Sequence, residues 1–372
     1  MDRRRFLKIL GITAGAGGLA YVGSRVMTNP PNSAREQGAS TNEFIEAWGE
    51  YHIVVYEKNG HYQAIDWHGS RICIDSNTAC IQEALNYIGS DCLARGGNCK
   101  VSLIIKPGTY EVSDSVDFRE AFPSYSSYYN YLSIVSEQGS VIQPSAYFSA
   151  SSNSALVILS PSSGSQIYFS RISLPYINAS MYTSSSINGL VISQVNDSVV
   201  NIPGVSYSSN VGVLINEGGS PGRYPNISGL PTAGFFNNLV TIGLLTFNKV
   251  GLATIGNDKT PLGVQANTFF IQHIYGNEKG IVLDENGAMP NGGSMWNQFL
   301  INVIEHNSEL GIMDNSGGNI FRVNNANTNP RYSDYIESSD VILGSYVIGY
   351  LADGYTLRRG ISRVINLWGG SS

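Results

Sequence analysis

Short stretches in which apolar and polar positions alternate recur along the second half of the chain. Residues 238–252 alternate in this way between two asparagines and end in a glycine and an apolar residue. The same order returns at residues 267–281 and 297–312, with a period of roughly thirty residues. A partial copy opens at Asn319. The second half of the chain is therefore a repeat array.

Each copy contains apolar stretches that are too short for helices and have the period of two typical of strands. A single copy could not bury its apolar side chains, whereas coils stacked about 4.8 Å apart would form a continuous core. The pattern therefore predicts an all-β solenoid of parallel strands. We expect Asn238, Asn267 and Asn297 to stack as an amide ladder inside the bends, with simple turn formation as the alternative.

The segment before the repeats has a different pattern, which predicts a hairpin. Residues 52–56 and 62–66 are strand-like, and Asn59-Gly60 between them is typical of a hairpin turn. We assign residues 42–70 to this N-terminal β-hairpin.

A helix, an apolar strand and a Pro-Gly turn follow the hairpin. The helix is expected over residues 78–88, with Ser76 or Thr78 as its N-cap. The strand, residues 101–105, leads into Pro107-Gly108-Thr109-Tyr110. This order resembles the opening of proteins of the pectin-lyase-like superfamily, which includes pectate lyases and polygalacturonases.

The resemblance extends from Ala64 to the end of the chain. It implies a single-stranded right-handed parallel β-helix over residues 71–372, closed at its N-terminal end by the helix. It also implies a polysaccharide ligand, held along one parallel sheet. The chain lacks the polygalacturonase set of Asn-x-Asp, paired Asp, Gly-His-Gly and Arg-x-Lys, and it lacks the calcium-binding Asp cluster and catalytic Arg of pectate lyases. A shared fold does not carry activity with it.

Residues 1–27 resemble a twin-arginine export signal. Arg3, Arg4 and Arg5 precede Phe-Leu-Lys, and an apolar stretch follows over residues 9–22. This stretch is shorter than the ~20 residues that span a bilayer. The resemblance implies a secreted or cell-surface protein, whose only contact with a membrane would be an uncleaved N-terminal anchor. Residues 28–41 are expected to form a flexible linker.

Four cysteines lie close together in the sequence, at Cys73, Cys80, Cys92 and Cys99. In an exported protein they predict two disulfides at one end of the fold. Three pairings are open, and free core cysteines are the alternative.

The low charge narrows the range of ligands. Only 13% of the residues are charged, against roughly 25% in soluble domains, and the net charge is −6. No basic run occurs after the first eight residues, so the positive footprint of a nucleic-acid-binding protein is missing. A polar, uncharged surface suits neutral or weakly charged glycans.

Carboxylates at the ends of neighbouring Gly-apolar strands are the first catalytic candidates. Asp284 and Asp314 end such strands, and Glu285 is beside the first. Adjacent coils would place such carboxyls ~5 Å apart, the separation that a retaining glycosidase uses. Close carboxylates also tend to divide into an acid and a base. The simpler interpretation is that each Asp starts a turn, and the two are out of phase by one position.

A second catalytic candidate is Glu305 with His306, since His273 lies one coil earlier. A histidine there could act as an acid, a base or a sugar ligand, although a histidine on a bend is more often an ordinary surface residue. The substrate-binding candidates are His273, Arg322 and three tyrosines of a long insert, Tyr125, Tyr128 and Tyr129.

Two functions fit these observations. The chain is either a glycoside hydrolase or polysaccharide lyase with an acidic groove on one sheet, or a non-catalytic glycan-binding or cell-envelope protein. A lyase-like activity would imply a calcium ion, and no other cofactor or metal site is indicated. The expected partner in both cases is a polysaccharide or cell-surface glycan. The oligomeric state is left open.

Overall fold

In the computed structural model all elements below belong to one compact unit, Ile45–Ser372. The predicted export signal and linker lie outside the described residues. The described residues are 52–94, 100–122, 131–148, 155–162, 166–180, 187–216, 234–255, 263–284, 293–314, 318–327, 332–334, 346–351 and 363–366.

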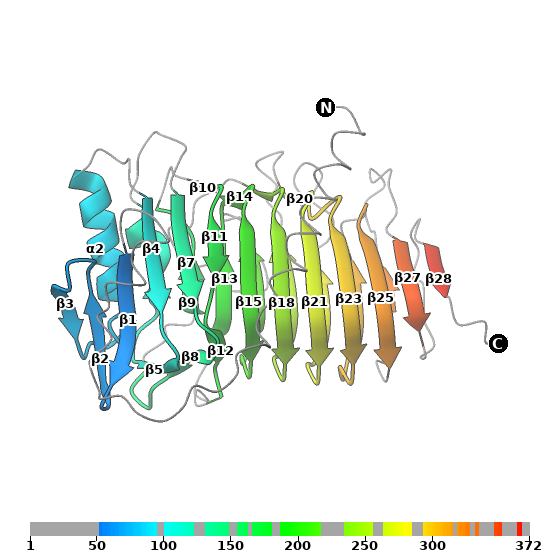
Figure 1. Cartoon of the computed structure of the whole chain (residues 1–372). Helices are drawn as coiled ribbons and strands as arrows, with labels where there is room; N and C mark the ends of the chain where they lie inside the picture. Colours follow the sequence, from blue (N-terminus) through cyan, green and yellow to red (C-terminus); the bar gives the residue numbers. More distant parts are fainter. Residues whose placement is uncertain are drawn as a thin grey trace, which may run out of the picture. The chain divides into compact units, whose positions relative to one another are not determined.

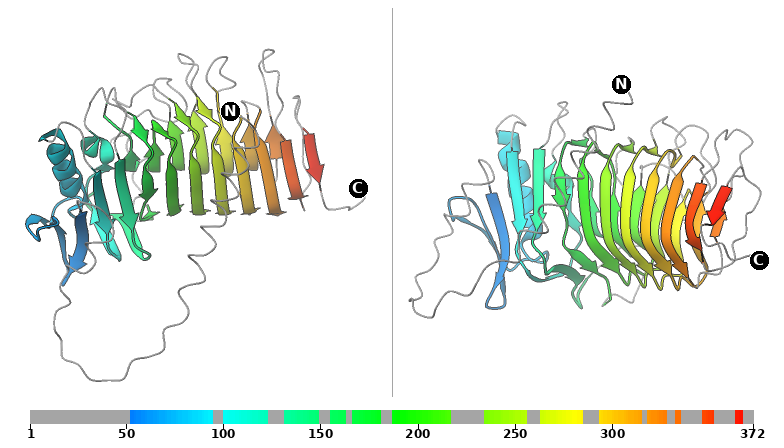
Figure 2. Two further views of the ribbon diagram at one scale, coloured as in Figure 1. Left: turned by 45° about the horizontal axis from the view of Figure 1, so that its top comes forward. Right: turned by 45° about the vertical axis from the view of Figure 1, so that its right-hand side comes forward.

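Within these ranges the largest sheet has 16 strands, most of which lie side by side along one path (Figures 1 and 2). Their order is β3 (Arg71–Ile74), β2 (His61–Ile65), β1 (His52–Lys58), β4 (Lys100–Ile105), β7 (Tyr131–Ser136), β11 (Arg171–Ser173), β15 (Val199–Ser206), β18 (Leu239–Thr246), β21 (Thr268–Tyr275), β23 (Gln298–Glu305), β25 (Ile320–Asn327), β27 (Tyr346–Leu351) and β28 (Arg363–Asn366). Off this path lie β5 (Gly108–Val112), β8 (Ser140–Pro144) and β12 (Tyr176–Asn178). From β1 to β28 the neighbouring strands are parallel, as β18 and β21 are.

Two further sheets are parallel throughout. The eight-stranded sheet contains β6 (Val116–Asp117), β9 (Ala155–Leu159), β13 (Asn188–Ile192), β16 (Val211–Asn216), β19 (Val250–Ile255), β22 (Lys279–Leu283), β24 (Leu310–Asp314) and β26 (Tyr332–Asp334). The short sheet contains β10 (Ile167–Tyr168), β14 (Val195–Asn196), β17 (Phe235–Phe236) and β20 (Val264–Gln265).

Four described coils pass through the three sheets in turn, because the short sheet has four strands. For example, β17 of the short sheet leads into β18 of the large sheet and then β19 of the eight-stranded sheet. We call the turn before the large sheet the first bend and the turn after it the second bend. The protein is thus mostly β with long parallel sheets, which confirms the predicted all-β, solenoid-like arrangement.

The predicted asparagine ladder is confirmed at the first bend. The side-chain amide of Asn238 donates from Nδ2 to Oδ1 of Asn267 at 3.0 Å, and Asn267 donates to Asn297 at 2.9 Å. Asn297 donates to Asn319 at 3.0 Å. All four side chains are buried, so the ladder replaces hydrogen bonds that the turning backbone would otherwise make with water.

A second ladder runs along the second bend. Asn248 Nδ2 donates to Asn277 Oδ1 at 3.1 Å, and Asn277 donates to Asn307 at 3.0 Å. The backbone N–H groups of Asn248 and Asn277 also bind the next Oδ1. Both bends of these coils are therefore held by the same chemistry.

The strands of the large sheet change phase in the middle. In β18, Val240, Ile242 and Leu245 point into the core, so Gly243 and Leu244 lie consecutively on the outward side. The same step occurs in β21 and β23, and Figure 2 shows these strands curving. The step explains why two adjacent residues, such as Gly243 and Leu244, differ from one repeat to the next, since both lie on the outward side.

The eight-stranded sheet is buried on both faces. All six residues of β19 are buried, with Leu252 in the main core and Ala253 in a second apolar cluster on the other face. Burial on both faces explains why these strands are almost continuously apolar in the sequence.

The N-terminal hairpin is confirmed. Strands β1 and β2 are antiparallel, with Lys58 opposite His61 and both turn residues, Asn59 and Gly60, at positive φ. The hairpin also extends the large sheet, because β1 pairs in parallel with β4.

The helix α2 (Ile81–Ala94) begins and ends later than predicted. Ala79 and Cys80 have φ of 50° and 63°, which excludes them from the helix. The helix continues through Gly89, where a Cβ would lie 1.8 Å from the backbone oxygen of Glu120. Gly89 thus allows the 3-10 helix η2 (Phe118–Ala121) to pack closely. Neither of these two helices has the length and apolarity needed to cross a membrane.

One of the predicted disulfides joins Cys73 to Cys80. Cys92 is also disulfide-bonded, and Cys99 lies outside the described residues. The described bridge ties β3 to the turn before α2.

Candidate functional site

The first pair of candidate carboxylates is buried. Asp284 is 3% exposed and Asp314 is 1% exposed. Asp284 accepts hydrogen bonds from the N–H and Oγ of Ser294, at 2.7 and 3.2 Å, and Asp314 accepts one from Asn319 Nδ2 at 2.9 Å. Asp314 pairs with Leu283 in the sheet, so the carboxylates are offset by one residue, as the sequence indicated. Both side chains therefore hold bends in place.

The sheet expected to carry an acidic groove is not an open surface. It is the eight-stranded sheet, whose strands are buried on both faces. We therefore place the candidate site on the large sheet, whose outward residues are exposed. Four other predicted site residues lie outside the described residues, namely Glu285, Tyr125, Tyr128 and Tyr129.

The second set of candidates is brought together on neighbouring strands of the large sheet. His273 Nε2 on β21 lies 3.1 Å from Glu305 Oε1 on β23, and both side chains are partly exposed. The ring of Tyr275 lies 5.6 Å from that of His273 and 5.3 Å from that of His306, between ring centroids. The cluster thus combines a histidine–carboxylate pair, which could move a proton, with aromatic surface.

Rings continue from this cluster along the second bend. Phe247 lies 5.4 Å from Tyr275 and perpendicular to it, and Tyr207 stacks on Phe247 at 5.1 Å with 17° between the ring planes. Tyr207 and Phe247 are 47% and 46% exposed. We call Tyr207, Phe247, Tyr275 and His306 the aromatic row.

The local backbone explains the aromatic row. Tyr207, Phe247, Gly276 and His306 occupy the same position of successive coils, and all have φ between 56° and 66°. This conformation turns the side chain outward. A Cβ at Gly276 would lie 2.8 Å from Phe247 Cε1, so the Phe247 ring uses the space that glycine leaves, and Tyr275 supplies the ring of that coil. The sequence contained a signal, namely aromatic residues directly before the second bend, which the repeat pattern left as a variable position.

Arg322 lies outside the cluster. It faces outward on β25 opposite Leu300. The residue opposite His273 on β23 is Val303, and the residue opposite Val303 on β25 is Asn325. Arg322 therefore shares the face of the candidate site without joining its histidine–carboxylate pair.

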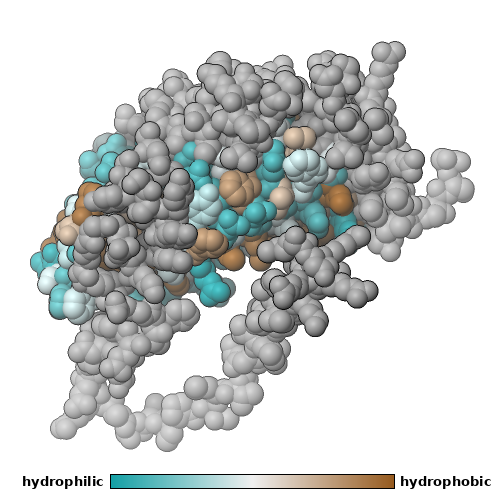
Figure 3. Space-filling view, turned by 90° about the horizontal axis from the view of Figure 1, so that it is seen from above, coloured by the Kyte–Doolittle hydropathy of each residue, from teal (hydrophilic) through white to brown (hydrophobic). Residues whose placement is uncertain are grey.

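The first bend carries scattered aromatic side chains. Phe169 and Trp296 are exposed there at positive φ, but Asp197, Asn237 and Ala266 hold the same position in the coils between them. The view from above in Figure 3 shows apolar side chains mixed with hydrophilic ones among the described residues. Of the two bends, only the second therefore presents an exposed row of rings within the described coils, whereas the stacked rings of Phe269, Phe299 and Phe321 are buried in the core.

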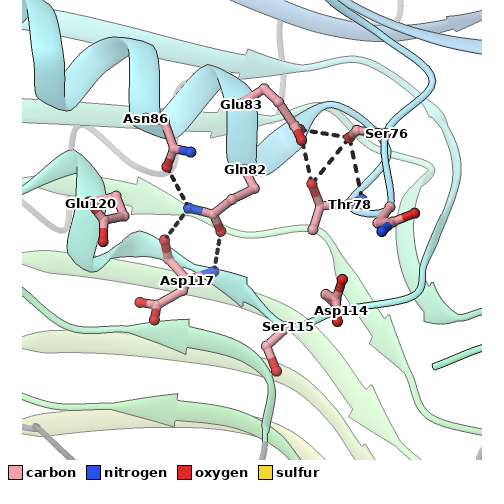
Figure 4. Close-up of a pocket in the computed structure, with 10 residues that line it drawn as sticks. Ser76, Thr78, Gln82, Glu83, Asn86, Asp114, Ser115, Asp117 and Glu120 are labelled. Carbon is pink, nitrogen blue, oxygen red and sulfur yellow. Dashed lines mark hydrogen bonds between the residues drawn. The ribbon is translucent and has the colours of Figure 1, made fainter. Parts of the chain in front are cut away.

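A polar depression of about 680 Å³ lies beside α2 (Figure 4). Glu83 accepts hydrogen bonds from Ser76 Oγ and Thr78 Oγ1 at 2.7 and 2.9 Å. Gln82 Nε2 donates to the backbone oxygen of Asp117 at 2.9 Å, and the backbone N–H of Asp117 donates to Gln82 Oε1 at 2.7 Å. These side chains join the start of α2 to β6. Their structural role explains why the depression is lined by polar groups.

Among the described residues, no group of three or more His, Cys, Asp and Glu side chains could hold a metal ion. The chain matches no protein-family model and no curated protein. The function is therefore inferred from the exposed surface of the large sheet and the second bend.

Proposed function

We propose that this protein is an exported right-handed parallel β-helix protein that binds polysaccharide at the cell surface without cleaving it. The observation that carries the proposal is the aromatic row, whose rings lie at one bend of successive coils. Aromatic side chains combine a large apolar surface with polar edges, and sugars present C–H groups and hydroxyls in the same way.

The fold and compartment in this proposal have separate support. Strands joined by parallel crossovers follow a right-handed path in about 98% of cases. The Cys73–Cys80 disulfide fits an oxidising environment, and the N-terminus resembles a twin-arginine signal.

Binding is preferred to cleavage because Asp284 and Asp314 are buried and engaged in the bends. One observation favours cleavage as a second candidate function, namely the partly exposed pair of His273 and Glu305. A histidine and a carboxylate in hydrogen-bond contact can transfer a proton to or from a bound sugar.

The proposal is tested by measuring polysaccharide binding of the full chain together with the release of reducing ends and unsaturated uronates. We expect wild-type protein to bind and to release no new ends. Phe247→Ala should weaken binding about tenfold, or ~1.4 kcal/mol. The control is Tyr147→Ala, since Tyr147 is 86% exposed and lies outside the aromatic row.

Two results would decide against this function. Wild-type protein that binds no polymer would remove the proposal. New chain ends that disappear in Glu305→Gln would replace binding by cleavage, with Glu305 as the acid or base.

A further inference from the structure

The outward face of the large sheet is exposed beside the aromatic row. Leu244 on β18 is 38% exposed and Phe270 on β21 is 43% exposed, although the residue after each, Leu245 and Ile271, points into the core. Phe270 pairs across the strands with Thr241 on one side and Leu300 on the other. Phe270 and Leu300 thus form an apolar pair on the outward surface, and contiguous exposed apolar patches are typical of binding sites.

A row of side-chain amides crosses the same face. Gln272, Asn302 and Asn324 occupy the step of β21, β23 and β25, since the residues before them, Ile271, Ile301 and Val323, are paired. Asn324 Nδ2 donates to Asn302 Oδ1 at 3.3 Å. Neighbouring amides follow the strand spacing of about 4.8 Å, and each offers both donors and an acceptor.

Apolar side chains lie on both sides of the amide row. Phe270 and Leu300 form the row on one side, and Val303, opposite His273, lies on the other. A ligand that fits this face has hydrogen-bonding groups along its middle and apolar surface beside them. Sugar rings have this character, because hydroxyls surround a ring whose faces expose C–H groups.

Formal charge is sparse on this face. On the described outward side of β15, β18, β21, β23 and β25, formal charges come from Glu305 and Arg322, and Glu305 contacts His273. A surface that selects an anionic polymer concentrates positive charge, whereas this face presents amides, hydroxyls and apolar groups. Its charge therefore matches an uncharged ligand.

We infer that this face binds an uncharged polysaccharide whose chain lies across the strands, with its hydroxyls on Gln272, Asn302 and Asn324 and its C–H surfaces on Phe270 and Leu300. The inference rests on the proposed function and adds the class of polymer.

The test compares neutral polymers, a β-glucan and a galactomannan, with the acidic polymers polygalacturonate and alginate, by titration of the full chain. We expect binding of a neutral polymer that changes less than about twofold between low and high salt, since no ion pairs are screened. Phe270→Ala and Gln272→Ala should each weaken it about tenfold, whereas Tyr147→Ala should not. Circular dichroism checks that each variant keeps the wild-type spectrum.

The alternative outcomes separate the two proposals. Salt-sensitive binding of acidic polymers alone would overturn the inference and leave polysaccharide binding in place, whereas failure to bind any polymer would remove both. Unchanged neutral-polymer binding in both variants would move the ligand off this face. Sedimentation that shows wild-type dimers lost in Phe270→Ala would make the face an interface between copies of the chain.

Discussion

Each buried asparagine of the first ladder serves several backbone and side-chain groups at once. Asn267 accepts from the N–H and Nδ2 of Asn238, both at 3.0 Å, and donates to Phe235 O and to Asn297 Oδ1, both at 2.9 Å. A group that loses its only partner inside the protein costs about 1–3 kcal/mol. The side chain of Asn267 therefore contributes to stability through several hydrogen bonds at once.

We expect Asn267→Ala to lower the free energy of unfolding by at least about 3 kcal/mol, because it leaves more than one buried group without a partner. Urea unfolding followed by circular dichroism measures the change. Asn324→Ala is the matched control, because this exposed amide should change stability by less than about 0.5 kcal/mol. Equal losses in the two variants would show that the ladder adds no special stability.

The ladder could be predicted because residue type and spacing repeat together at Asn238, Asn267 and Asn297. The direction of Asp284 and Asp314 could not be, since an Asp at the end of a strand can face solvent or a bend. At Asp284 the chain takes φ of 49°, and the carboxylate bonds to Ser294. The repeat pattern contains neither the dihedral angle nor the partner.

At the scale of the strand, successive coils approach each other closely at the step of the large sheet. A Cβ added at Gly243 would lie 2.1 Å from the backbone oxygen of Pro203 on the preceding coil. The contact is with backbone, which cannot rotate away as a flexible side chain can. Glycine at this position therefore allows β15 and β18 to pack this closely.

We expect Gly243→Ala to destabilise the protein by about 1–3 kcal/mol through overpacking. Thr241→Ala, two residues away on the same outward side, is the control and should have little effect. Thermal unfolding of both variants measures the difference. A Gly243→Ala variant as stable as wild type would mean that the coils separate at no cost.

The boundaries of α2 illustrate what a sequence pattern omits at this scale. The apolar spacing correctly indicates a helix, but its start depends on the left-handed conformation of Ala79 and Cys80. The helix also continues through Gly89, whose missing Cβ leaves room for the backbone of Glu120 in η2. Neither the left-handed conformation before the helix nor the packing at Gly89 is contained in the apolar spacing.

At the scale of the whole repeat array, each coil contacts its neighbours, so a local change should spread over a short distance. The Cys73–Cys80 disulfide lies at the hairpin end, many coils away from β21 and β23. The sequence indicated the stack but not which sheet is exposed, because burial of an outer face depends on the rest of the fold.

We expect the double variant Cys73→Ser with Cys80→Ser to exchange backbone amides faster in β2, β3 and the start of α2, because the turn loses its covalent link. Protection in β21 and β23 should stay at the wild-type level. Hydrogen exchange read by mass spectrometry tests this. Faster exchange spread equally to β21 and β23 would show that the stack opens as one cooperative unit.

In the coils that begin at Asn238, Asn267 and Asn297, the same number of residues separates the asparagine of the first ladder from that of the second. The length of a whole coil varies, because successive residues of the first ladder are 29, 30 and 22 residues apart. Variation in length is thus confined to the part of each turn outside the span between the ladders. Insertions and deletions in such a chain can therefore occur outside this span while the two asparagine ladders are retained. The molecule can diversify what it displays without having to redesign how it folds.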